Sequence, residues 1–129
     1  MDTEAQAKEK MQWEEIKKQA RVLHAFRGVR IFFAATRHLY FHIAAALGAV
    51  LLGLYVDLVP LEWVAIVFAI GLVFCAECFN TAIEIDIDLT SPEYHPYARD
   101  TKDVAAGTVL IAGFISLIVG CIIFIPKFL

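Results

Sequence analysis

The stretch that decides the fold is residues 61–90, which read LEWVAIVFAIGLVFCAECFNTAIEIDIDLT. Its first part, residues 61–79, is apolar apart from Glu62, Glu77 and a few small side chains. A helix needs about 20 predominantly apolar residues to cross a bilayer. The stretch therefore predicts a membrane-spanning helix that runs on, after residue 79, into a polar segment.

Two more apolar runs lie on either side of this one, at residues 42–59 and 104–125. The link between the first two runs is very short and ends in Pro60, a residue suited to the start of a helix, so these helices form an antiparallel hairpin. The chain has 129 residues, 60% of them apolar and 19% charged, which excludes an ordinary soluble domain and a disordered chain. The predicted fold class is an all-α integral membrane protein whose domain at residues 42–129 contains three transmembrane helices.

Residues 1–41 form a second predicted region, a polar and amphipathic helix on the membrane surface. Apolar side chains recur at helical spacing between Val22 and Phe33, and arginines lie between them. A helix with an apolar face and basic flanks is attracted to anionic lipid. Membrane anchoring explains most of this pattern, and either Arg27 or Arg30 is in addition a candidate to face a phosphate group; Arg30 is kept as a candidate nucleotide-binding residue.

The positive charges predict the orientation. Eight of the 11 Lys and Arg residues lie in residues 1–41, and Arg99 and Lys102 lie between the second and third spans. Cytoplasmic segments carry the excess of Lys and Arg. The N-terminus and the loop at residues 81–103 are therefore expected in the cytoplasm, and the C-terminus outside. A strongly basic patch is absent, so nucleic acid is not an expected partner.

Acidic and amide side chains at the end of the second span indicate a functional site. Asn80, Glu84 and Asp88 follow Glu77 at offsets of 3, 7 and 11, which places all four on one helix face. A carboxylate at the depth of Glu77 costs about 3 kcal/mol if it behaves like Asp on insertion scales, and a function would offset that cost. Such oxygen ligands favour a hard cation, Mg²⁺ or Ca²⁺, and Mg²⁺ commonly takes one or two carboxylates together with substrate phosphates. A solvated polar face is the alternative, and it is favoured for Asp88 and for Asp86, which falls on the opposite side of the helix.

Lys102 and Asp103 directly precede the third apolar run, at the predicted N-terminus of its helix. Backbone N–H groups and the helix dipole favour an anion at that position. Lys102 is thus a candidate partner for transferred phosphates, and Asp103 is a candidate cap of the helix. For His95, which lies in the preceding loop, a hydrogen-bonded structural role is expected.

These residues resemble the signature of the prokaryotic diacylglycerol kinase family. The matching segments are AECFNTAIE at residues 76–84, Asp88, EYHP at 93–96 and KDVAAG at 102–107. The resemblance covers about residues 22–129. Residues 94–96 and 105–107 look more like the undecaprenol kinase branch than like the proteobacterial diacylglycerol kinases.

The resemblance implies an ATP-dependent lipid kinase that transfers the γ-phosphate to a membrane lipid alcohol, undecaprenol or diacylglycerol. It also implies a homotrimer of three-span subunits, each with a surface helix, in the bacterial cytoplasmic (inner) membrane, with active sites shared between neighbours. Carried over by position, Glu77 resembles the general base and Glu84 a Mg²⁺ ligand. Asn80 lies beside the phosphates, Lys102 contacts them, and Asp103 lies next to the nucleotide.

One segment departs from the family pattern. The family usually has a glutamate that helps to hold the metal just before the first span, in a context like E-x-N-x-R-I-H. Aligned on His42, this chain has Thr36 at the glutamate position, His38 at the asparagine and Tyr40 at the arginine. A hydroxyl is a weaker Mg²⁺ ligand than a carboxylate. The departure implies reduced metal affinity, a repositioned nucleotide, or a catalytically weakened scaffold or accessory subunit on the same fold.

Overall fold

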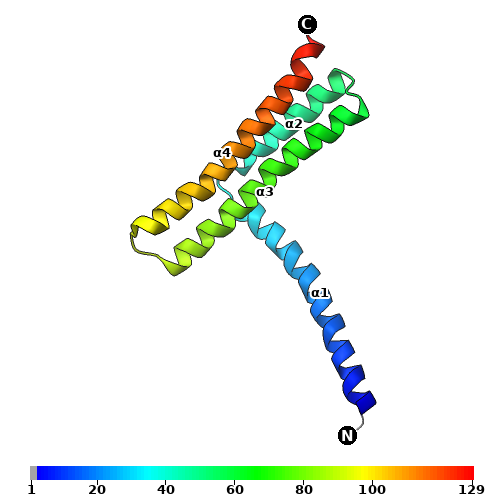
Figure 1. Ribbon diagram of the computed structural model, residues 1–129, viewed down its shortest axis with the longest axis vertical. Helices are drawn as coiled ribbons and strands as arrows, with labels where there is room; N and C mark the ends of the chain where they lie inside the picture. The colour runs from blue at the N-terminus through cyan, green and yellow to red at the C-terminus, as the bar shows by residue number, and fades with distance from the viewer. Residues whose placement is uncertain (1–2) are drawn as a thin grey trace. The chain divides into compact units, whose positions relative to one another are not determined.

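The computed structural model describes residues 3–129, and the side chains of all of these except residues 3–7, 13, 16 and 19. Within that range it contains helices and short connections and no strand, which confirms the all-α prediction (Figure 1). The elements in chain order are α1 Thr3–Ala35, α2 Leu39–Tyr55, α3 Pro60–Thr90, α4 Pro96–Phe124 and a short 3₁₀ helix, η1, Ile125–Lys127.

The contacts divide the chain into two compact units, which meet at Ala35 and Thr36. The predicted boundary at residue 41 therefore lies inside the second unit. The described part of the first unit is the helix α1, in which Val22, Leu23 and Phe26 are exposed. Exposed apolar side chains on a helix are suited to contact with lipid. The first two residues of the predicted N-terminal region lie outside the described residues.

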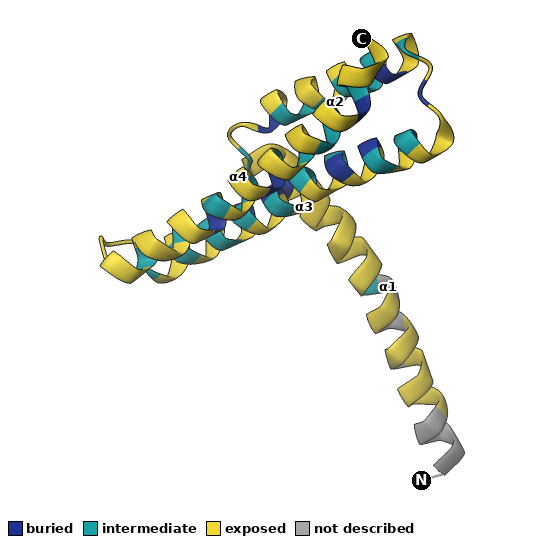
Figure 2. Ribbon diagram, turned by 45° about the horizontal axis from the view of Figure 1, so that its top comes forward, coloured by how far each residue is buried: buried dark blue, intermediate teal, exposed yellow. Residues whose placement is uncertain are grey.

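The second unit consists of α2, α3 and α4. Helices α3 and α4 pack side by side over much of their length (Figure 1). A buried cluster of Leu58, Ile66 and Ile123 joins the turn between α2 and α3 to the end of α4. Most of the remaining apolar side chains are exposed, as the large yellow share of Figure 2 shows. Apolar surface on this scale needs lipid or a protein partner to cover it.

Two helices of the described chain are long and apolar enough to cross a membrane, Pro60–Thr90 and Pro96–Lys127. A third candidate exists if Ala20–Ala35 and Leu39–Tyr55 together form one interrupted span. Helix α2 alone has 17 residues, slightly short of the usual length of a span. The structure thus supports an all-helical membrane protein with two or three candidate spans.

The predicted loop at residues 81–103 is largely helical. Helix α3 continues to Thr90 and α4 already begins at Pro96, so that only Ser91–His95 connect them. The apolar runs predict only the part of each helix that contacts lipid. Both helices extend beyond these runs because backbone hydrogen bonds also form between polar residues. His95 is the N-cap residue of α4, and its Nδ1 accepts a hydrogen bond of 3.3 Å from the backbone N–H of Tyr97. This contact confirms the structural role expected for His95.

The turn between α2 and α3 is fixed by a backbone motif. The N–H of Leu58 donates to the carbonyl of Gly53 at 3.1 Å, and Asp57 between them has a φ of 51°. This arrangement is the Schellman motif, in which one residue takes the left-handed conformation that Asp tolerates better than most. Pro60 then begins α3, as predicted, and the two helices run antiparallel.

Gly53 lies where α2 comes closest to this turn. A Cβ atom added at Gly53 would lie 2.9 Å from Leu58 Cδ1 and 2.9 Å from Trp63 Cη2. We expect Gly53→Ala to destabilise the protein by about 1–3 kcal/mol, the usual cost of overpacking a close contact. Thermal unfolding in detergent measures this as a lower Tm. Gly48→Ala, on the same helix with open space at its Cβ, is the matched control, and an equal effect of both variants would contradict the prediction.

Candidate active site

The polar residues of α3 share one face of a continuous helix, as their spacing predicted. Glu77 and Thr81 are buried, Asn80 and Glu84 are half-buried, and Asp88 is exposed. Thr81, at offset 4 from Glu77, belongs to the same face. The face therefore passes from a buried end at Glu77 to a solvated end at Asp88, over a rise of about 16 Å. The exposure of Asp88 agrees with the solvated role favoured for it.

Glu77 is paired with a histidine of α2. The Nε2 atom of His42 lies 2.6 Å from Oε1 of Glu77, and the two side chains are 17% and 8% exposed. A buried carboxylate is strongly disfavoured unless it is hydrogen-bonded. His42 supplies that hydrogen bond and joins the first helix of the unit to the second.

Asn80 and Glu84 form a second pair one turn farther along α3. The amide nitrogen Nδ2 of Asn80 donates to Glu84 Oε1 at 3.3 Å. The amide oxygen Oδ1 of Asn80 is buried and has no hydrogen-bond partner among the described residues. A buried oxygen without a donor, adjacent to a carboxylate, suits a hard cation such as Mg²⁺.

This pair does not form a complete metal site by itself. Among the described residues, no three His, Cys, Asp or Glu side chains are grouped so that they could hold a metal ion. Mg²⁺ commonly takes one or two carboxylates and fills its remaining positions with substrate phosphates and water. The donor set of Glu84 and Asn80 therefore fits a cation that arrives with a nucleotide.

Thr36, at the position of the family glutamate, contacts the same polar face. Its Oγ1 lies 2.8 Å from Oγ1 of Thr81, so one hydroxyl donates to the other. Thr81 lies between Glu77 and Glu84 in the sequence and on the same side of α3. Where the family has a carboxylate, this chain therefore has a neutral hydroxyl pair on the polar face of α3.

Lys102 reaches the solvated end of this face from α4. Its Nζ forms an ion pair with Oδ1 of Asp88, and both side chains are substantially exposed. Since α4 begins at Pro96, Lys102 and Asp103 lie within the helix and not at its N-terminus. The expected capping role of Asp103 is therefore wrong, because His95 caps the helix. A phosphate near Lys102 would have to be held by the side chain, since the backbone N–H groups there are bonded within the helix.

Two further predicted site residues lie apart from these contacts. Asp103 is exposed on α4. Arg30 belongs to the first unit, where it is exposed on α1. Their roles beside the nucleotide stay predictions.

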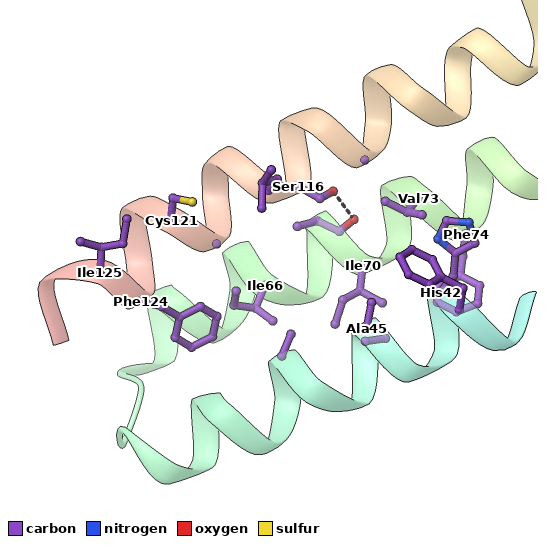
Figure 3. Close-up of a pocket in the computed structure, with 17 residues that line it drawn as sticks. His42, Ala45, Ile66, Ile70, Val73, Phe74, Ser116, Cys121, Phe124 and Ile125 are labelled. Atoms are coloured by element: carbon purple, nitrogen blue, oxygen red, sulfur yellow. Dashed lines mark hydrogen bonds between the residues drawn. The ribbon is translucent and has the colours of Figure 1, made fainter. Parts of the chain in front are cut away.

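A cavity of about 640 Å³ lies between α2, α3 and α4 (Figure 3). His42 lies at one end, and Phe124 and Ile125 lie at the other. The lining is almost entirely apolar; the hydroxyl of Ser116 already donates to the carbonyl of Ala69 at 2.9 Å. His42 is therefore the side chain that connects an apolar cavity to the buried carboxylate of Glu77.

The sequence analysis did not predict the contacts that α2 and the segment before it make with the polar face of α3. His42 served only to align the family pattern, and Thr81 was not singled out. The signal for Thr81 was present in its offset of 4 from Glu77, which places it on the polar face. The signal for His42 was weaker, because its pairing with Glu77 depends on how two helices pack.

Comparison with known proteins finds the same family whose signature these residues resemble. The family model described as prokaryotic diacylglycerol kinase matches residues 23–124. The chain is 42% identical to the undecaprenol kinase of Bacillus subtilis (strain 168) over 105 residues, which are 81% of this chain and 85% of that protein.

Two diacylglycerol kinases are also similar. That of Synechocystis sp. is 32% identical over 107 residues, which are 82% of this chain and 61% of that protein. That of Escherichia coli (strain K12) is 33% identical over 79 residues, which are 61% of this chain and 65% of that protein. The chain thus spans slightly less than two thirds of each of these two proteins.

Proposed function

The chain belongs to the prokaryotic diacylglycerol kinase family and is a lipid kinase, and we propose that it transfers the γ-phosphate of ATP to the hydroxyl of undecaprenol. Diacylglycerol is the second candidate acceptor. The observation that carries the proposal is the buried Glu77, held by His42 at the end of an apolar cavity. The higher identity to an undecaprenol kinase, over most of both chains, supports the order of the two acceptors.

Glu77 is the proposed general base. It accepts the proton of the lipid hydroxyl while the hydroxyl oxygen bonds to the γ-phosphorus, and the bond from that phosphorus to the β–γ bridging oxygen breaks to release ADP. Catalysis of phosphoryl transfer is mostly positioning and charge neutralisation. Lys102 is proposed to contribute positive charge to the phosphates, Arg30 to face a phosphate, and Asp103 to lie next to the nucleotide.

Glu84 is the proposed Mg²⁺ ligand, with the unpartnered Oδ1 of Asn80 as the second protein oxygen. A bound Mg²⁺ supplies positive charge that offsets the charge developing on the phosphates. The half-buried position of both residues keeps them reachable from the solvated end of the polar face. These two residues would hold the cation where it can also bind the phosphates of the nucleotide.

The apolar lining of the cavity supports the proposal that the acceptor is a long-chain lipid alcohol. An amphiphile has one polar end and an apolar body, and the cavity has the same division, with His42 at its polar end. A pocket of a few hundred Å³ with few polar groups is typical of sites for apolar ligands. The hydrocarbon chain of the lipid alcohol is the proposed occupant, with the hydroxyl at Glu77.

The orientation and assembly are also part of the proposal. The N-terminus and the tip of the α3–α4 hairpin lie in the cytoplasm and the C-terminus outside, since the N-terminal segment carries most of the positive charge. With three spans per subunit, α2 completes the membrane domain and α1 lies on the surface. A homotrimer with shared sites is supported by the exposed apolar faces, which neighbouring subunits would cover in part.

A labelled-phosphate assay tests the function. The purified protein in phospholipid vesicles receives ATP labelled at the γ-phosphate, together with undecaprenol, diacylglycerol or both in competition. We expect labelled undecaprenyl phosphate, with diacylglycerol a poorer acceptor. Absence of any labelled lipid with every alcohol, from protein whose folding is verified by thermal unfolding, would overturn the kinase proposal. Preferential labelling of diacylglycerol would reverse the order of acceptors.

A scaffold or accessory role is not favoured, because the relatives carry the names of kinases. The departure at Thr36 bears on metal affinity within the kinase. We expect Thr36→Glu to lower the Mg²⁺ concentration for half-maximal activity about tenfold, which corresponds to about 1.4 kcal/mol. The reason is that a carboxylate would replace a neutral hydroxyl that contacts Thr81, on the helix face that also carries Glu84. Activity measured across a Mg²⁺ titration checks this result.

Thr36→Val is the matched control for that variant. It removes the hydroxyl contact with Thr81 and adds no charge, so that the Mg²⁺ requirement should stay the same. If Thr36→Glu left the half-saturating Mg²⁺ concentration unchanged while activity was retained, Thr36 would not lie beside the metal.

A further inference from the structure

None of the roles carried over from the family explains why His42 lies where it does. It lies in the first turns of α2, lines the cavity and contacts Glu77 through Nε2 at 2.6 Å. Its ring packs edge-on against Phe41, with the ring centroids 5.6 Å apart. The imidazole is therefore fixed by a neighbouring ring on its own helix and by a carboxylate on α3.

We propose that His42 is the positioning residue for Glu77 in the phosphoryl transfer, an inference that rests on the proposed function. The Nε2–H of His42 donates to Oε1 of Glu77 and fixes the plane of the carboxylate. Oε2 is then the oxygen that accepts the proton of the lipid hydroxyl. Because His42 also lines the cavity, the same ring determines where the hydroxyl end of the acceptor stops.

Two observations and one general principle support this role. Both side chains of the pair are largely buried, so water cannot replace the donor at low cost. The pair joins two helices, so that its geometry is set by the packing of α2 on α3 and not by one flexible loop. General bases in enzymes are commonly oriented by a further group in this way. A merely structural ion pair would stabilise the fold without controlling the chemical step.

Two conservative variants separate these roles. In His42→Gln the amide nitrogen lies near the former position of Nε2. In His42→Asn the amide nitrogen lies near the former position of Nδ1, and the side chain is too short to reach Glu77. We expect His42→Asn to lower kcat about 10²-fold, at the low end of what a positioned proton-transfer group contributes. We expect His42→Gln to retain kcat within a few-fold of the wild type. The KM for ATP should be unchanged in both, because neither variant alters the nucleotide ligands.

A spectroscopic measurement tests the pair independently of activity. In ¹⁵N-histidine NMR of the full protein in vesicles, His42 should appear as the Nε2–H tautomer with a downfield proton. Glu77→Gln should shift that resonance and leave those of His24, His38 and His95 unchanged. A His42 resonance without such a proton, or one insensitive to Glu77→Gln, would overturn the contact itself.

The outcomes distinguish this proposal from the proposed function. A wild-type enzyme that phosphorylates lipid, with His42→Asn as active as His42→Gln, overturns the positioning role and leaves the kinase intact. A KM for the lipid acceptor that rises while kcat is unchanged makes His42 a cavity-wall residue only.

A Tm that is lower in His42→Asn than in His42→Gln, with equal kcat in both, indicates a structural pair. A wild type that phosphorylates no lipid overturns the function, while the NMR still reports whether the pair exists.

Discussion

Replacing Glu77 by glutamine is expected to lower kcat by about 10²- to 10⁴-fold, the range that general acid–base groups contribute. Glutamine has nearly the same size as glutamate, and its amide oxygen still accepts a hydrogen bond from His42, so the contact between α2 and α3 persists. If Glu77 is the general base, as proposed, the variant loses the ability to accept the proton of the lipid hydroxyl. Phosphate transfer from labelled ATP to the lipid alcohol, measured with saturating substrates, gives the effect on kcat.

The fold of this variant provides the control. Because the buried charge is removed and the hydrogen bond is kept, we expect the Tm of Glu77→Gln in detergent to equal or exceed that of the wild type. Nucleotide binding, followed with a fluorescent ATP analogue, should be unchanged. A variant with intact Tm and wild-type kcat would show that Glu77 is a structural carboxylate and that another group accepts the proton.

Glu84→Gln is expected to raise the Mg²⁺ concentration for half-maximal activity by about 10- to 100-fold, the range typical of disturbing a metal site. Glu84 contributes the charged oxygen beside the unpartnered amide oxygen of Asn80. A neutral amide in its place weakens the attraction for a divalent cation. A titration of activity with Mg²⁺ at fixed ATP measures the shift, and high Mg²⁺ should restore much of the activity.

Asp86→Asn is the matched control for this effect. Asp86 lies on the same helix, also near its C-terminal end, but on the opposite side from the polar face, and it is exposed. The two variants remove the same charge from the same region of the protein. Equal shifts in the Mg²⁺ requirement would mean that the general negative charge of α3 matters and that Glu84 is no specific ligand.

Periodicity and apolar length predicted the helices well because both depend on local sequence. The apolar run at residues 61–79 lies within α3, and the offsets from Glu77 correctly placed Asn80, Glu84 and Asp88 on one face. The prediction erred where the chain leaves the apolar region. The helix through Asp88 was predicted, but residues 96–103, which were predicted as loop, form the first turns of α4, because a helix satisfies its own backbone hydrogen bonds whether or not its side chains are apolar. This error misplaced Lys102 and Asp103 at a helix terminus.

The candidate site was predictable only in part, for a related reason. A helical repeat relates residues on the same helix, so the sequence indicated the donor set on α3. It could not indicate that His42 contacts Glu77 or that Thr36 contacts Thr81. These residues are separated by 35 and 45 positions, and each contact depends on the packing of other segments against α3.

The sequence by itself thus determined the membrane class, the helices and the single polar face that carries Glu77, Asn80 and Glu84. These features follow from apolar length and the pitch of one helix. The tertiary structure decided the partner of Glu77, the hydroxyl pair at Thr36 and the cavity between three helices. These depend on distances between segments remote in the sequence, which are fixed by the packing of side chains.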